Sequence, residues 1–175
     1  MKLLFRCFVF VTLVTLHSSV FSQPFINEIK AFRKADSITA PAKDAILLIG
    51  SSSFTNWKNV ATYFPNHTII NRGFGGSSLP HMTLYAEDII FKYNPKQIII
   101  YCGENDLTGG PSITADTVFE RVKKLHQLIR SRYKKVTISY ISMKPSPSRE
   151  KYLETMPFVK SQRRSVPSFE NESAL

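Results

Sequence analysis

The fold of this chain is decided by residues 45–53, which read AILLIGSSS. The apolar run is continuous from Ala45 to Ile49 and stops at Gly50. A short continuous apolar run that ends at glycine is typical of a strand buried on both faces of a parallel sheet. Serines follow the glycine directly, so this strand is expected to present polar side chains at its carboxyl end.

Helical and strand-like patterns alternate along the rest of the chain. Apolar residues at helical spacing predict helices over residues 25–35, 79–93 and 116–132. Short apolar runs predict further strands over residues 68–71, 97–102 and 135–142. Strands that alternate with helices require crossover connections, which favours an α/β fold with a parallel sheet. Ligands of such sheets bind beyond the carboxyl ends of the strands.

Length and composition exclude several other classes of protein. The 175 residues correspond to one domain, and 43% hydrophobic with 21% charged residues is the balance of a globular protein. Two cysteines are too few for a disulfide framework or a cysteine-rich metal site. The net charge of +10 is compatible with an anionic partner, but the positive residues are scattered, and we predict no nucleic-acid binding.

Residues 1–22 have the pattern of a secretory signal peptide. Lys2 and Arg6 give a positively charged start, residues 3–16 are mostly apolar, and small residues precede a cleavage position before Gln23. The apolar run is too short for a comfortable membrane span, although an uncleaved membrane anchor is the alternative interpretation. We therefore expect an extracytoplasmic protein, secreted or periplasmic, without a stable membrane span.

The remaining chain divides into a folded part and a tail. We predict an α/β domain over residues 23–158. Residues 159–175 show neither helical nor strand periodicity and are predicted to be disordered.

Polar loops follow three of the predicted strands, at residues 50–53, 71–78 and 103–106. Each has a simple structural interpretation, because serine often caps a helix and both a glycine-rich stretch and an Asn-Asp pair often form turns. Parallel strands, however, bring all three loops to one edge of the sheet. Their convergence favours a binding or catalytic site.

The loops also contain residue types that acyl transfer requires. A serine at the end of a strand can act as a nucleophile, and nearby backbone N–H groups can stabilise an oxyanion. The Asn105 side chain supplies a neutral N–H donor for the same purpose. The lipase pattern G-x-S-x-G is not met, because Phe54 replaces its second glycine. The dinucleotide pattern G-x-G-x-x-G is not met either, because Ser78 replaces its last glycine.

Taken together, the loops resemble those of the SGNH, or GDSL-type, esterase and acylhydrolase superfamily, near its platelet-activating-factor acetylhydrolase-like proteins. The matching residues are Ser52 in GSSSFTNW, Asn71-x-Gly73-x-x-Gly76, and Gly103-x-Asn105-Asp106. The resemblance implies that Ser52 is the nucleophile and that the backbone N–H groups of Ser52 and Gly76 and the side chain of Asn105 form the oxyanion hole. It also implies a three-layer α/β/α sandwich with a flavodoxin-like parallel sheet. The commonest form of the first motif has Asp where this chain has Ser51.

The general base of that superfamily is absent from the sequence. Members carry it as the histidine of an Asp-x-x-His motif near the C-terminus, and this chain has no such motif. The histidines all precede the last predicted strand, and they are His17, His67, His81 and His126. His81 follows the glycine-rich loop, but we do not expect it to replace the missing base. We therefore expect a C-terminally truncated domain that lacks the last strand of its sheet.

The function implied by the resemblance is that of a secreted serine ester hydrolase. Its substrates would be small acyl esters or O-acetylated carbohydrates, and neither a cofactor nor a metal ion is expected. Two alternatives remain open. One is a catalytically impaired, truncated relative, and the other is a flavodoxin-like protein that binds phosphate or a nucleotide.

Overall fold

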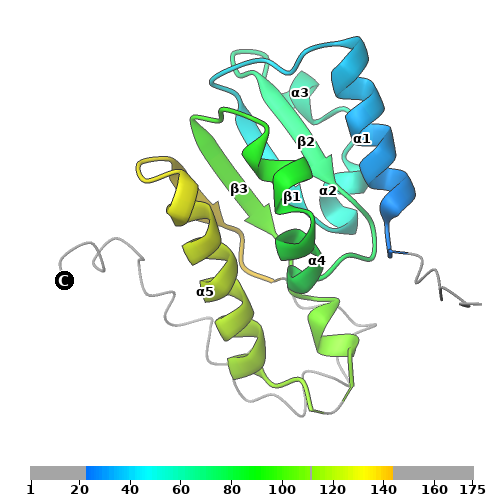
Figure 1. Ribbon diagram of the computed structural model, residues 1–175, viewed down its shortest axis with the longest axis vertical. Coiled ribbons are helices and arrows are strands. Elements are labelled where there is room, and N and C mark those ends of the chain that lie inside the picture. The colour runs from blue at the N-terminus through cyan, green and yellow to red at the C-terminus, as the bar shows by residue number, and fades with distance from the viewer. Residues whose placement is uncertain (1–22, 111, 144–175) are drawn as a thin grey trace, which may run out of the picture.

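The sheet has the predicted parallel architecture. The computed structural model describes residues 23–110 and 112–143 (Figure 1). In this part of the chain, four parallel strands have the order β2-β1-β3-β4. Their bounds are Ile46–Gly50 for β1, Ile69–Gly73 for β2, Gln97–Tyr101 for β3 and Thr137–Tyr140 for β4. Ile46 lies between Ile69 and Gln97 in neighbouring strands, and Gln97 in turn lies beside Thr137.

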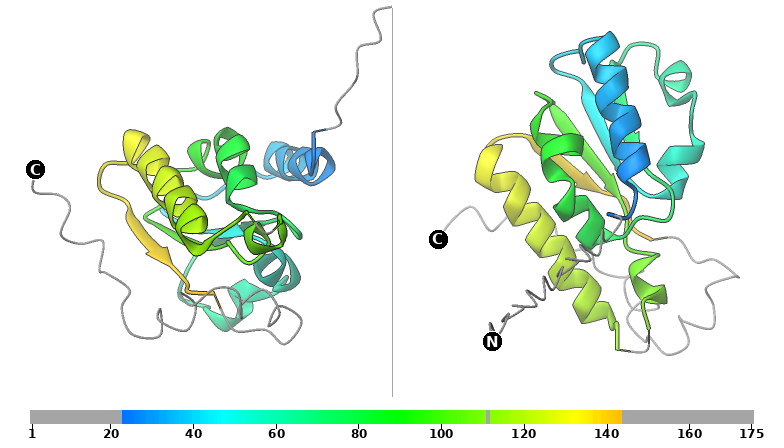
Figure 2. Two further views of the ribbon diagram at one scale, coloured as in Figure 1. Left: turned by 90° about the horizontal axis from the view of Figure 1, so that it is seen from below. Right: turned by 45° about the vertical axis from the view of Figure 1, so that its right-hand side comes forward.

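Helices cover both faces of the sheet, which gives three layers (Figure 2). One face carries the long helices α1 and α5 together with α4 and the π-helical segment η1, and the other face carries α2 and α3. The bounds are Ile26–Ile38 for α1, Ser52–Asn56 for α2, Val60–Tyr63 for α3, Leu79–Leu84 for α4, Glu87–Phe91 for η1, Asp106–Thr108 for the 3-10 helix η2 and Ala115–Arg132 for α5. The predicted α/β fold is confirmed.

Side chains of the central strand β1 alternate between two cores. Leu47 and Ile49 are buried among residues of α1, α4, η1 and α5. Leu48 lies in a smaller core with Phe54 of α2 and Val60 of α3. Successive side chains of a strand face opposite sides of the sheet, so burial of all three explains why the apolar run is continuous.

The predicted helix over residues 79–93 differs from the observed one. α4 is followed by the π-helical segment η1 rather than by further α-helix. The change occurs at Tyr85, whose carbonyl accepts hydrogen bonds from the N–H groups of both Asp88 and Ile89. Met82, Tyr85 and Ile89 are buried all the same. Apolar spacing therefore identifies the buried face here, but it does not distinguish the two helix types.

Three predictions concern residues that lie outside the described part of the chain. They are the signal peptide at residues 1–22, the disordered tail at residues 159–175 and the predicted absence of a last strand beyond β4. Between residues 23 and 143, with residue 111 left aside, no helix is long and apolar enough to cross a membrane.

Candidate functional site

The three polar loops lie together at the carboxyl ends of β1, β2 and β3 (Figure 1). The backbone N–H of Ser51 donates to the Tyr101 carbonyl at 3.2 Å, which joins the first loop to the end of β3. The N–H of Phe74 donates to the Gly50 carbonyl at 2.9 Å, which joins the second loop to the first. The structure therefore brings together the segments that the sequence predicts to form a site.

Two glycines permit this close approach of the loops. A Cβ atom on Gly50 would lie 2.1 Å from the Tyr101 carbonyl oxygen. A Cβ atom on Gly73 would lie 2.6 Å from the Cβ of Phe54 in α2. Either side chain would displace neighbouring atoms, so glycine is required at both positions for packing.

Ser52 is exposed at the start of α2 and lies beside the glycine-rich loop. A Cβ atom on Gly75 would lie 4.0 Å from both Cα and Cβ of Ser52. Within the described residues, the backbone N–H groups of Ser52 and Gly76 have no hydrogen-bond acceptor, and the same holds for Ser53 and Gly75. Gly76 has a φ of +81°, which glycine adopts without strain. These N–H groups are available to a bound oxyanion.

The Asn105 carboxamide is held between the other two loops. Its Nδ2 donates to the Ser51 Oγ at 2.7 Å and to the Ser77 carbonyl at 2.9 Å. A carboxamide nitrogen has two hydrogens, and these two acceptors account for both. An oxyanion at this position therefore competes with the Ser51 hydroxyl for one hydrogen of Asn105. Ser51, which stands where the commonest form of the motif has Asp, thus supplies the hydroxyl that orients Asn105.

Asp106 is a structural carboxylate. It is 2% exposed, and it accepts hydrogen bonds from the Leu79 N–H at 3.0 Å and from Arg121 at 2.7 Å. These contacts fix the start of α4 and one face of α5 to the loop after β3. An Asn-Asp pair in a sequence predicts only a turn. Asp106 pairs with Arg121, which lies 15 residues later, so no local sequence pattern predicts this structural role.

Asp106→Ala is expected to lower the free energy of unfolding by about 3 kcal/mol, as measured by urea denaturation. The variant leaves Arg121 without its partner and the Leu79 N–H without an acceptor. We expect the lower end of the range for buried pairs because the Arg121 side chain is 30% exposed. The control is Asp116→Ala, an exposed position in the first turn of α5, which should change stability by less than about 1 kcal/mol. Equal effects of the two variants would contradict this role of Asp106.

His81 is committed to the start of α4. Its Nδ1 accepts a hydrogen bond from the Ser78 N–H at 3.1 Å and lies 2.8 Å from the Ser78 Oγ. Its ring packs edge-on against Phe25, with the ring centroids 4.8 Å apart. His81 makes no hydrogen bond with Ser52, so the structure does not bring it to the predicted nucleophile as a base.

Protein stability is expected to decrease below about pH 6.5 because of His81. Burial lowers the pKa of His81, although the nearby Asp106 carboxylate raises it. The unfolded chain therefore takes up the proton first, so the stabilisation is complete above the unfolded pKa and is lost as the pH falls toward the lower folded value. His81→Gln retains an acceptor for the Ser78 N–H and should remove this dependence. Unfolding midpoints across this pH range test the expectation, which an unchanged slope in His81→Gln would contradict.

The environment of Cys102 does not favour a reactive thiolate. Cys102 is buried next to the Ser77 carbonyl, and burial raises the pKa of its thiol, so the reactive thiolate is disfavoured. Residues 23–110 and 112–143 contain no group of three or more His, Cys, Asp or Glu side chains that could hold a metal ion. Ser52 remains the predicted nucleophile.

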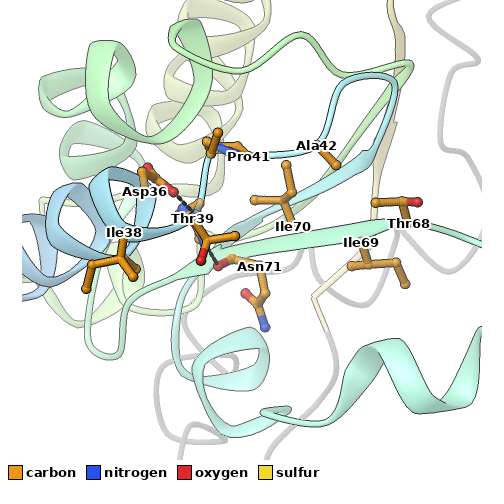
Figure 3. Close-up of a pocket in the computed structure, with 12 residues that line it drawn as sticks. Asp36, Ile38, Thr39, Pro41, Ala42, Thr68, Ile69, Ile70 and Asn71 are labelled. Carbon is orange, nitrogen blue, oxygen red and sulfur yellow. Dashed lines mark hydrogen bonds and ion pairs between the residues drawn. The ribbon is translucent and has the colours of Figure 1, made fainter.

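A groove lies beside the edge strand β2 (Figure 3). This groove has a volume of about 590 Å³ and lies between the end of α1 and β2. The Asp36 carboxylate at this groove is bound by Arg72, Lys92 and Tyr93. Burial opposes ionisation, but these partners together lower the pKa of Asp36. The Asp36 charge is already paired, and Ser52, Gly76 and Asn105 do not line the groove, so we assign it no catalytic role.

Several solved structures share this arrangement of strands and helices. A GDSL-like lipase from Bacteroides thetaiotaomicron matches with a TM-score of 0.62 and 17% identity, over 76% of this chain and 68% of the lipase. A proposed acylhydrolase from Bacteroides fragilis matches with a TM-score of 0.59 and 16% identity, over 79% and 75% of the two chains. A protein from Streptococcus pneumonia, proposed to be a platelet activating factor, matches with a TM-score of 0.60 and 21% identity, over 73% and 58%. The chain has the fold of GDSL-like lipases and acylhydrolases.

The GDSL-like fold confirms the predicted resemblance at the level of architecture. The chain spans 58% of the length of the Streptococcus protein. No model of a protein family and no curated protein matches the sequence. Because the identities to the solved structures are low, the match concerns the fold, and the roles of Ser52, Gly76 and Asn105 stay predictions.

Proposed function

We propose that this chain is a serine ester hydrolase with Ser52 as its nucleophile. The observation that carries the proposal is the position of Ser52, which is exposed beside Gly75 and Gly76, whose N–H groups have no acceptor within the described residues. An ester carbonyl bound here has its carbon toward the Ser52 Oγ and its oxygen toward the N–H groups of Ser52 and Gly76. The GDSL-like fold supports the same reaction class by analogy.

The proposed reaction proceeds through an acyl-enzyme. The Ser52 Oγ bonds to the carbonyl carbon as its proton passes to water, and the carbonyl oxygen becomes the oxyanion. Asn105 joins the backbone donors by exchanging its hydrogen bond to the Ser51 hydroxyl for one to the oxyanion. The carbon–oxygen bond to the alcohol then breaks, and the alcohol leaves with a proton. Water hydrolyses the acyl group from Ser52 in a second step of the same kind.

Removal of the Ser52 proton is the step of this mechanism that the chain assists least. The sequence has no Asp-x-x-His motif, and the Nδ1 of His81 already accepts from Ser78. In a serine triad, loss of the base lowers turnover by about a million-fold. The oxyanion hole and substrate binding alone retain roughly 10³- to 10⁴-fold acceleration over water. We therefore propose slow turnover, with a catalytically impaired relative as the limiting case.

The proposed substrates are small acyl esters or O-acetylated carbohydrates. All of the contacts assigned above involve the ester group that these two classes share, so they support both equally. The pattern of residues 1–22 supports a location outside the cytoplasm, in a secreted or periplasmic protein. The proposed mechanism uses side chains and backbone groups of the chain itself, without a metal ion or cofactor.

The test is ester hydrolysis by the full chain, with p-nitrophenyl acetate and an acetylated xylan oligosaccharide as the two substrates. We expect release of acetate by the wild type and by Ser53→Ala, but none above background by Ser52→Ala. Ser53 is a matched control because it is the next residue of α2. Equal rates for wild type and Ser52→Ala would contradict the proposal. Nucleotide binding by calorimetry, without ester hydrolysis, would support the phosphate-binding alternative instead.

A further inference from the structure

Phe25 has a strained backbone conformation immediately before α1. Its φ of 65° and ψ of 14° lie in the left-handed region, which a bulky residue rarely adopts. The Phe25 carbonyl accepts from the Ile29 N–H at 3.1 Å, and the preceding carbonyl, of Pro24, accepts from the Tyr85 hydroxyl at 2.5 Å. Strained residues of this kind concentrate at functional sites, so the contacts of the Phe25 ring bear on function.

The Phe25 ring lies against the glycine-rich loop. α1 begins at the same edge of the sheet as the three polar loops (Figure 1 and Figure 2). The ring packs edge-on against Phe74, with centroids 5.3 Å apart, and against His81. A Cβ atom on Gly76 would lie 3.7 Å from the Phe25 Cε1. The partly exposed ring therefore borders the residue whose N–H we assign to the oxyanion hole.

We infer that Phe25 is a specificity-determining residue whose ring forms one wall of the acyl-binding pocket. In the proposed reaction, the carbonyl oxygen lies about 3 Å from the Gly76 N–H. The acyl carbons next to that carbonyl are then within reach of the ring that borders Gly76. The ring gives apolar contact to a short acyl group and leaves little space for a long one. This inference rests on the proposed function, because it assigns a pocket to the acyl group of that reaction.

The turn itself does not explain a phenylalanine at this position. Glycine adopts a φ near 65° without strain, so glycine would satisfy the backbone better. α1 has anchors of its own, since Ile29 is completely buried and Arg33 pairs with Asp88 of η1 at 2.6 Å. The reason for a phenylalanine at position 25 therefore lies in its side chain and not in its backbone conformation. Its contacts with Phe74 and His81 hold the ring beside the loop.

The test measures selectivity for the size of the group that reaches Ser52. A fluorophosphonate modifies a nucleophilic serine by forming an Oγ–P bond, while fluoride leaves and the serine proton passes to water. The full chain and its Phe25→Ala and Phe25→Gly variants are treated with methyl and octyl fluorophosphonates, and mass spectrometry gives the rate of Ser52 modification. Removal of the ring is expected to raise the octyl-to-methyl rate ratio by about tenfold or more. Phe25→Gly relieves the strained φ, so it provides the measurement if Phe25→Ala folds poorly.

Phe32→Ala is the matched control. Phe32 lies about two turns further along α1, packs partly buried against the same core and lies 5.1 Å from the Arg72 guanidinium. Its rate ratio should equal that of the wild type. An unchanged ratio in the Phe25 variants, or an equal decrease of both rates, overturns the inference while Ser52 modification upholds the proposed function. Failure of the wild type to react at Ser52 overturns the proposed function and this inference with it.

Discussion

A fusion of this chain with the Asp-x-x-His segment of an active GDSL-like esterase is expected to hydrolyse p-nitrophenyl acetate up to about a million-fold faster than the chain itself. The sequence lacks that motif, and His81 uses its Nδ1 to accept from Ser78 rather than to activate Ser52. A serine hydroxyl is a weak nucleophile near pH 7 unless a base removes its proton as the new bond forms. Steady-state kinetics of the chain and the fusion measure the gain.

Two variants of the fusion test the origin of that gain. Changing the added histidine to alanine should return the rate to the level of the original chain. Ser52→Ala should do the same, whereas Ser53→Ala should retain the gain. A fusion that folds, as judged by circular dichroism, but hydrolyses the ester independently of Ser52 would contradict the proposed nucleophile.

Asn105→Ala is expected to lower the kcat of the fusion by roughly 100- to 1,000-fold, the usual effect of losing one oxyanion donor. The Asn105 carboxamide lies 2.7 Å from the Ser51 Oγ and 2.9 Å from the Ser77 carbonyl, which places it at the junction of the loops. Negative charge develops on the carbonyl oxygen only as the reaction proceeds. The loss should therefore appear in kcat rather than in KM.

Two comparisons distinguish donation by Asn105 from a purely structural role. Asn59→Ala changes an exposed asparagine whose side chain makes no capping hydrogen bond, and it should alter kcat by no more than about twofold. Ser51→Ala removes an acceptor of Asn105 but keeps the amide, so it should lower kcat far less than Asn105→Ala. If both lowered kcat equally, orientation by Ser51 would be the essential contribution.

The central strand β1 was predictable because it is buried on both faces of the sheet. Leu47, Leu48 and Ile49 lie in two different cores, so no position along the strand can be polar. α5 was predictable for a different reason, because its buried residues, which include Val118 and Ile129, repeat at helical spacing along one face. Burial imposes a pattern on consecutive residues, and such a pattern can be recognised without knowledge of tertiary contacts.

The site was predictable only in part, because its contacts join residues that are distant in sequence. The bond between Asn105 and Ser51 spans 54 positions, and no local pattern distinguishes a serine that orients an amide from one that caps a helix. Phe25 is similar, since its left-handed backbone and its contact with the loop at Gly76 depend on how α1 packs. The motifs indicate where the polar loops gather, but the orientation of each donor is a property of the folded chain.

Modification of Ser52 by a fluorophosphonate tests most directly whether Ser52 is the nucleophile of an ester hydrolase. The full chain is treated with the probe, digested and analysed by mass spectrometry to locate the phosphonyl group. We expect the group on Ser52, retained in Ser53→Ala, formed much more slowly in Asn105→Ala and absent from Ser52→Ala. No modification of the wild type, or equal modification of wild type and Ser52→Ala, would contradict the assignment.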